Sequence, residues 1–306
     1  MAVYVNTNIS SLNGRRYLNN VQNQLTTTYQ RLSSGMRINS AKDDAAGLQI
    51  ADRLTTQING LNQGNRNTND GIALAQTMEG ALDETTNMLQ KIRTLAVQSA
   101  NGTNTAEDRK ALTTEANALT AEITRIAQQT KFGGKTILVG NSVGSIYHSG
   151  GNAAQNGSKG GKMTLQVGAN NGDAITFSIN NFTFKALWTD VKGKANNGTK
   201  ASDDGIAIKL DTASSAKAAI DLMDAMIARV DSQRSGLGAI QNRLESSIRN
   251  QSNVAANQAD ARSRIRDADF AEESAALSQQ SIIQQAATSM LMQANSRPQL
   301  ALSMLG

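Results

Sequence analysis

The scarcity of proline is the feature that most limits what this chain can fold into. Pro298 is the only proline among 306 residues. Proline interrupts helices because it lacks a backbone N–H and its ring clashes with the preceding turn. Its absence from the rest of the chain permits very long helices. An aromatic content of 3% is also low for a compact globular core.

Apolar spacing predicts a helix near the N-terminal end and a much longer one after it. Alternating steps of three and four residues mark one narrow stripe. The stripe consists of Leu18, Val21, Leu25 and Leu32, with Thr28 in the remaining seam position. No proline interrupts Ala45 to Ala100, which predicts a helix of about 80 Å at roughly 1.5 Å per residue. Asp43 or Asp44 is the expected cap of this helix.

A third helix and a small β-region are predicted for the middle of the chain. The same three-and-four spacing covers residues 112–126, and Thr105 with Asp108 forms a capping box ahead of it. Residues 163–167 and 174–179 flank an Asn-Gly turn. That arrangement predicts a β-hairpin.

The C-terminal part carries the most regular heptad in the sequence. Its apolar positions are Ile220, Met223, Ile227, Val230, Leu237, Leu244 and Ile248. Arg234 and Gln241 occupy two positions of the same seam, where polar residues can fix the register. Beyond Asp260 another helical stretch runs on, and Arg297 is its only charged residue after Glu273. A helix so poor in charge needs a partner to cover it.

These patterns predict a mainly α protein, a long antiparallel helical bundle with terminal coiled-coil helices and a small β-hairpin region. Residues 1–43 and 262–306 are expected to form a terminal coiled-coil domain. Their stripes are too thin to fold without neighbouring copies. We expect residues 44–180 and 205–261 to form the bundle with its hairpin, and residues 181–204 to be a short variable surface insertion.

The residues that enzymes and metal sites require are scarce. His148 is the only histidine and lies in a Gly-rich stretch, which excludes a histidine-based zinc site or a Ser-His-Asp triad. The absence of cysteine excludes disulfides and thiolate metal sites. The spacing around Gly133, Gly134 and Gly140 does not match a nucleotide-binding loop. We expect no enzymatic activity and no cofactor.

The charge pattern does not favour binding to nucleic acid. A net charge of +5 arises from 30 basic and 25 acidic residues that are mixed along the chain. The densest basic run is Arg262, Arg264 and Arg266, and Asp267 and Asp269 follow it, so a solvated face or ion pairing is preferred over phosphate binding. No apolar run is long enough to span a membrane, and the first eight residues lack a secretory signal. These features alone favour a soluble cytoplasmic protein.

Both ends of the chain closely resemble the bacterial flagellins. The N-terminal resemblance is carried by residues 6–13, 30–47, 69–77 and 89–101, the last of which reads LQKIRTLAVQSAN. The C-terminal resemblance is carried by residues 261–270, which read ARSRIRDADF, and by residues 284–286. Together they cover roughly the first 140 and last 95 residues, in the family's order.

The resemblance implies a structural subunit that polymerises into the flagellar filament for swimming motility. In that family the termini pair as an inner coiled coil, while the bundle and its hairpin form the filament wall. The termini are disordered in the monomer and fold on polymerisation. The residues implied to pack in the filament core are Leu18, Val21, Leu25, Leu32, Ile282, Ile283 and Leu291.

The resemblance also implies a location and a set of partners. Flagellins leave the cell unfolded through a type III export apparatus, so an extracellular flagellar location without a cleaved signal peptide is expected. Besides identical subunits, the implied partners are filament cap proteins, hook-junction proteins and an export chaperone that binds roughly Ala268 to Gly306. Toll-like receptor 5 is implied as a host partner. Its contacts would be Gln90, Lys91, Leu95 and Glu115. Lysine at 91 replaces the usual arginine, so the charge is kept and the planar fork is lost.

Three other interpretations stay open. A hook-filament junction protein shares the terminal helices, although the full C-terminal signature favours the filament subunit. A metallopeptidase domain, which some flagellins carry in the middle, would need an HExxH motif that this chain lacks. A cytoplasmic helical adaptor would stay monomeric, and truncation of either terminus would distinguish it from a polymerising subunit.

Overall fold

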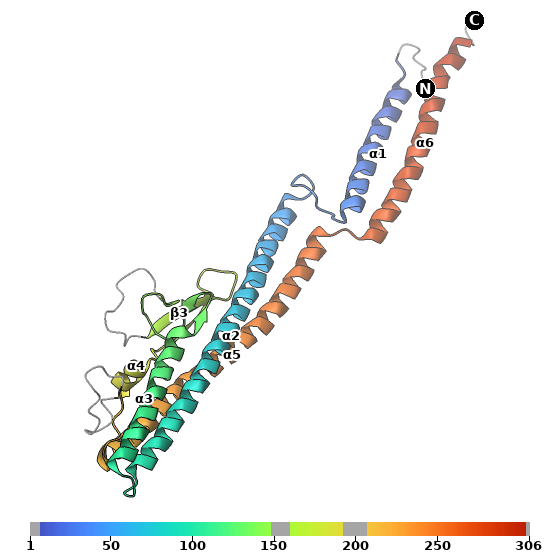
Figure 1. Cartoon of the computed structure of the whole chain (residues 1–306). Coiled ribbons are helices and arrows are strands. Elements are labelled where there is room, and N and C mark those ends of the chain that lie inside the picture. Colours follow the sequence, from blue (N-terminus) through green and yellow to red (C-terminus); the bar gives the residue numbers. More distant parts are fainter. Residues whose placement is uncertain (1–6, 148–159, 192–206, 304–306) are drawn as a thin grey trace. The chain divides into compact units, whose positions relative to one another are not determined.

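A computed structural model describes residues 7–147, 160–191 and 207–303 of the chain, with the side chains of residues 297–303 left out. The main chain is predominantly helical, as predicted (Figure 1). The helices are α1 (Ile9–Ser34), α2 (Ala45–Ala100), α3 (Ala106–Gln129), α4 (Phe184–Val191), α5 (Ala213–Arg266) and α6 (Phe270–Ser303). The strands are β1 (Lys131–Phe132), β2 (Lys135–Thr136), β3 (Gly161–Gln166) and β4 (Ala174–Ile179).

The chain packs as two compact units, and α2 and α5 each contribute to both. The smaller unit, which we call the terminal unit, comprises Met1–Asn59 and Val254–Gly306. The larger, which we call the bundle unit, comprises Gly60–Asn253. The domain boundaries predicted at residues 43 and 262 are a finer division and stay a prediction.

The bundle unit contains the hydrophobic core. Its α2, α3 and α5 segments bury apolar side chains against one another, together with side chains from the β-region and α4. Fully buried examples are Leu74, Met78, Leu82, Leu89, Ile92, Ile123, Met223, Val230, Leu237 and Leu244. The heptad predicted for α5 therefore faces the core: four of its apolar members are buried there, and Ile220 and Ile227 pack against it partly buried.

The two polar seam residues of α5 have partners on α2. Arg234 forms an ion pair with Asp83 at 2.9 Å. The Nε2 of Gln241 donates a hydrogen bond to Glu79 at 2.9 Å. Because the two acidic residues lie four positions apart on α2, the two bonds fix α5 against α2 in one register.

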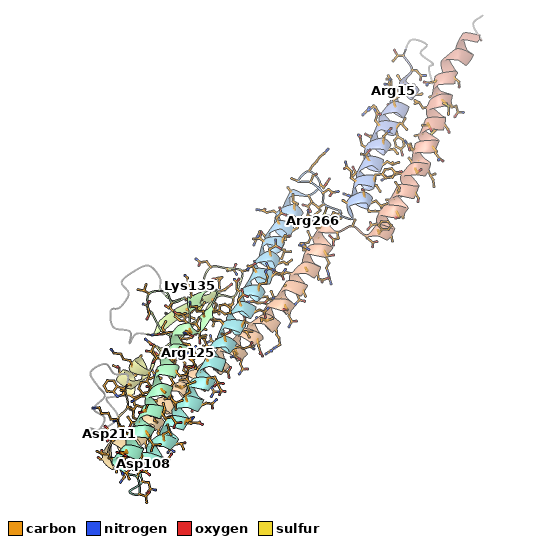
Figure 2. The ribbon with its side chains drawn as sticks, viewed as in Figure 1. Arg15, Asp108, Arg125, Lys135, Asp211 and Arg266 are labelled. Atoms are coloured by element: carbon orange, nitrogen blue, oxygen red, sulfur yellow. The ribbon has the colours of Figure 1, made fainter. Side chains whose placement is uncertain are left out.

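The predicted capping residues cap the first turns of α2 and α3. The Oδ1 of Asp44 accepts a hydrogen bond from the backbone N–H of Gly47 at 2.8 Å, so Asp44 caps α2. Thr105 and Asp108 form a capping box at the start of α3, as predicted (Figure 2 labels Asp108). The sequence signals for these two helix starts are confirmed.

The predicted β-hairpin is present and lies against α2. Strands β3 and β4 pair antiparallel from Gly161 with Ile179 to Gln166 with Ala174. Gly172 has a φ of 97° in the turn, a conformation that favours glycine. The Nδ2 of Asn67, on α2, donates to the carbonyl of Gln166 at 3.0 Å, which holds the end of β3.

Three glycines of α2 let the hairpin approach the helix backbone. A Cβ added to Gly64 would lie 2.0 Å from the carbonyl oxygen of Val167, and one added to Gly71 would lie 2.4 Å from Leu165. At Gly60 the nearest atom, from Ala169, would be 2.7 Å away. No larger side chain fits at these positions without moving the hairpin.

The structure corrects the expected surface insertion at residues 181–204. Residues 184–191 form α4, and Phe182, Phe184 and Leu187 are at most 2% exposed within the core. These apolar side chains belong to the core of the bundle unit, so this part of the prediction is wrong. Residues 192–204, like His148, lie outside the described residues. The short strands β1 and β2 were not predicted either.

Candidate assembly surface of the terminal helices

Helices α1 and α6 lie side by side and antiparallel in the terminal unit (Figure 1). At one end the Nδ2 of Asn8 donates to the carbonyl of Ala294 at 2.8 Å. Towards the other end Arg31 forms an ion pair with Glu273 at 3.0 Å. These bonds fix which turn of α1 faces which turn of α6.

The seam between α1 and α6 is a heptad on each helix, and it is thinly packed. On α1 the seam residues are Ser11, Gly14, Leu18, Val21, Leu25, Thr28 and Leu32. On α6 they are Glu273, Leu277, Gln280, Gln284, Ala287, Leu291 and Ala294. Only Val21, Thr28 and Ala287 among them are buried, at 4%, 5% and 6% exposed. The isolated pair therefore gains little from apolar burial.

The structure distributes the predicted core residues over two faces. Leu18, Leu25, Leu32, Ile283 and Leu291 are half-buried along the α1 and α6 contact. Ile282 instead is 66% exposed and points away from α1. Whether these residues pack in a filament core depends on contacts between copies, so that role stays a prediction.

Two seam positions of α1 were missed because their side chains are small. Ser11 and Gly14 extend the predicted stripe by one further heptad towards the N-terminus. A Cβ on Gly14 would lie 3.1 Å from the Cδ1 of Leu291, so glycine makes room for that leucine. Hydrophobic periodicity alone does not detect such a position.

A groove of about 790 Å³ runs along one flank of the α1 and α6 pair. We call it the flank groove. Its lining residues are Ser10, Asn13, Gly14, Tyr17, Ile283, Ala286, Ala287, Met290, Gln293 and Ala294. The lining carries no charged side chain, and small residues form part of it.

The segment between α1 and α2 pairs with the segment between α5 and α6 through residues 35–37 and 266–268, which we call the connector. Met36 and Asp267 form an antiparallel β-bridge. The N–H of Arg37 donates to the carbonyl of Arg266 at 2.7 Å, and the N–H of Ala268 donates to the carbonyl of Gly35 at 3.0 Å (Figure 2 labels Arg266). Local sequence patterns do not predict this pairing because it joins segments far apart in the chain.

The carboxylate of Asp43 organises the loop beside the connector. It accepts hydrogen bonds from the backbone N–H groups of Ser40 at 2.9 Å and Asn39 at 3.1 Å. These bonds favour the charged form, with the bond from Ser40 contributing most, and they lower the pKa of Asp43. Beside this loop, the side chain of Ile38 is only 2% exposed.

The residues implied as immune-receptor contacts lie on α2 and α3 of the bundle unit. Gln90, Lys91 and Glu115 are exposed. Lys91 forms an ion pair with Glu115 at 3.2 Å. Leu95 is only 7% exposed and belongs to the core. Lys91 and Glu115 therefore meet at the surface, Gln90 is exposed next to Lys91 on α2, and Leu95 lies in the core.

Both ends of the chain, including α1 and α6, match the models of one protein family. Residues 5–143 match the bacterial flagellin N-terminal helical region, and residues 220–305 match the bacterial flagellin C-terminal helical region. Flagellin B of Vibrio anguillarum is 37% identical over 379 aligned positions that cover 100% of both chains. The chain belongs to the bacterial flagellin family. As a flagellin, it is a structural subunit that polymerises into the flagellar filament.

Further relatives agree with this assignment. Flagellin A of Vibrio cholerae is 39% identical over 379 positions, again covering 100% of both chains. A solved structure described as a hook-associated flagellar protein of Vibrio parahaemolyticus covers 74% of this chain and 100% of its own, with a TM-score of 0.54. It is 16% identical, so it supports the fold alone. Full-length similarity to flagellins favours the filament subunit over the hook-junction alternative.

The described residues of this flagellin form neither a metal site nor a membrane-spanning helix. No group of three His, Asp or Glu side chains there lies close enough together to hold a metal ion. Nor is any helix among those residues long and apolar enough to cross a membrane. In the basic run near residue 264, Arg264 forms an ion pair at 3.0 Å with Asp260, which lies before the run and not after it, and both side chains are exposed.

Proposed function

We propose that α1 and α6 form the inner core of the filament and that neighbouring copies cover what each pair leaves exposed. Eight large apolar side chains of α1 and α6 are at least half exposed, and this observation carries the proposal. They are Ile9, Leu12, Tyr17, Tyr29, Phe270, Ile282, Met290 and Met292. So much apolar surface on two thinly packed helices favours their covering by other subunits.

The proposed core domain comprises residues 1–43 and 262–306, and the remainder forms the filament wall. Because the α1 and α6 seam buries few side chains, its helices gain most of their stability when copies pack together. The bundle unit has its own core and folds in the single chain. Assembly therefore orders the ends of a subunit whose wall is already folded.

Removal of α6 tests this proposal. A chain that lacks residues 270–306 is expected to stay monomeric under conditions in which the full chain forms filaments. Its bundle unit should unfold at the same temperature as in the full chain, measured by circular dichroism. Filaments from the shortened chain in electron micrographs would contradict the proposed core.

We further propose that the subunit is exported to the extracellular filament without loss of a signal peptide. Its proposed partners are a chaperone on residues 268–306, filament cap proteins and hook-junction proteins. Support comes from the family assignment and from the surface of α6, which carries no charged residue between Glu273 and Arg297. The intact mass of filament protein should retain the N-terminal residues from Ala2 onward. A mass that lacks an N-terminal segment would contradict this route.

We also propose that Toll-like receptor 5 contacts the exposed group formed by Gln90, Lys91 and Glu115. The buried Leu95 would contribute indirectly, by packing α2 against the core and so holding the exposed residues in place. In a receptor reporter assay, Lys91→Ala should lower the response and Lys91→Arg should raise it, because arginine offers a planar fork. Lys110→Ala, at an exposed lysine of α3, is the control. An unchanged response to Lys91→Ala would contradict the proposal.

A further inference from the structure

Helix α6 carries a second heptad stripe on the side that faces away from α1. Its residues are Ala275, Ser278, Ile282, Gln285, Ser289, Met292 and Ser296. All seven are exposed, and none is charged. We call them the outer stripe. Ile282 and Met292, its two large apolar members, are 66% and 68% exposed.

The outer stripe and the flank groove match in length and in chemistry. From Ile282 to Met292 the stripe spans about 15 Å of helix at about 1.5 Å per residue. The α6 wall of the groove, from Ile283 to Ala294, spans about 16 Å on the same scale. Neither surface carries a charged side chain, so neither has to desolvate an ion when it is covered.

We propose that the outer stripe of one subunit packs into the flank groove of a neighbouring subunit. This inference rests on the proposed function, because it specifies which surfaces of the inner core meet. Ile282 and Met292 would insert beside Tyr17 and Met290 of the neighbour, and Ser289 between them would allow close helix approach. The occupant of the groove is therefore a second copy of this chain.

The geometry of this contact bears on how the assembly grows. Stripe and groove are different surfaces of the same helix pair, so each subunit offers one of each. Such a heterologous contact leaves a free stripe and a free groove at the two ends of any chain of subunits, and it forms open helical filaments when the rotation does not close. A stripe that packed on another stripe would instead form closed dimers.

Cysteine cross-linking tests the contact, and the natural absence of cysteine gives a clean background. Asn13→Cys places a thiol in the groove, and Ser289→Cys places one at the middle of the stripe. Filaments of the double variant are oxidised with copper phenanthroline and analysed by denaturing electrophoresis without reductant. We expect a ladder of linked subunits, since a disulfide forms only where Cα atoms come within about 7 Å.

The single variants provide the controls. Filaments of either single variant should stay uncross-linked, while filaments grown from an equal mixture of both should give linked dimers and no ladder. Dimers from Ser289→Cys alone would show that stripe packs on stripe and would overturn the inference. So would filaments of the double variant that contain no linked subunits.

A second measurement separates this inference from the proposed core. Ile282→Asn should raise the critical concentration for polymerisation by about tenfold or more, because it removes one buried apolar side chain per contact. Ile282→Leu should leave it within about twofold. If Ile282→Asn polymerises normally, the stripe is not an interface. If truncation of α6 also leaves polymerisation intact, the proposed core itself fails.

Discussion

At the scale of single residues, polar side chains align the long helices of this flagellin. Gln241 and Arg234 bond to α2 in the bundle unit, and Arg31 bonds to Glu273 in the terminal unit. Apolar heptads tolerate sliding by whole heptads, whereas a specific polar pair does not. The few polar seam residues therefore determine which turns meet.

The ion pair between Arg31 and Glu273 can be tested by charge exchange. Arg31→Glu or Glu273→Arg alone places like charges together, and each should raise the critical concentration for polymerisation by about fivefold or more. The double exchange should restore it to within about twofold. Sedimentation of filaments measures this concentration. Equal defects in the single and double variants would show that the pair does not set the register.

The capping box of α3 predicts a pH dependence. Hydrogen bonds from the side chain and backbone of Thr105 lower the pKa of Asp108 from its usual 3.8. A carboxylate with a lowered folded pKa contributes stability above the unfolded value and loses it as pH falls through the folded value. The stability advantage of the natural chain over Asp108→Ala should thus be constant from pH 5 to 7 and shrink below about pH 4.

The matched control for this box is Glu107→Ala, in the same first turn of α3. Both substitutions remove one charge from the helix N-terminus, but only Asp108 bonds to Thr105. Urea unfolding of the full chain at several pH values compares them. An identical pH dependence for the two variants would mean that the helix dipole alone accounts for the effect.

At the scale of elements, the seating of the hairpin on α2 is the most specific feature of the bundle unit. Gly64→Ala should lower the free energy of unfolding by about 1–3 kcal/mol, because the new Cβ would overlap the carbonyl of Val167. Gly80→Ala in the same helix meets no atom within 4 Å. It should stabilise by about 0.5–1 kcal/mol through helix propensity. Denaturant unfolding monitored by circular dichroism would detect opposite signs, and equal signs would contradict the seating.

The long elements were predictable from the sequence because their signals are local. Periodicity, the lack of proline and two capping motifs gave the positions of α2, α3 and α5, and an Asn-Gly turn gave the hairpin. Helix α4 was missed because eight residues next to a polar stretch hold too few turns to show a period. The connector was missed because its partners are non-local.

The candidate assembly surface was only partly predictable for related reasons. The leucines and Val21 of α1 were identified by spacing, whereas Ser11 and Gly14 carry no apolar signal. On α6, apolar residues occur around the whole helix, so spacing cannot separate the seam from the outer stripe. Only the position of α1 in the structure distinguishes Leu291 from Ile282.

At the scale of the whole molecule, we expect the bundle unit to provide the stability of the single chain and the terminal unit to provide the contacts for assembly. Leu82→Ala, in the bundle core, should cost about 2–5 kcal/mol of unfolding free energy. Leu25→Ala truncates a half-buried side chain of α1 and should change the free energy of unfolding of the monomer by less than about 0.5 kcal/mol. It should instead raise the critical concentration for polymerisation. A large loss of monomer stability from Leu25→Ala would show that the terminal unit stabilises the single chain.

The connector between Met36 and Asp267 closes a loop of about 230 residues. The entropy of closing a loop grows only with the logarithm of its length. About 70 further residues between Met36 and Asp267 would add only about 0.2 kcal/mol to that cost. The outer part of such a subunit can thus lengthen or shorten during evolution at almost no thermodynamic cost to the joining of its ends.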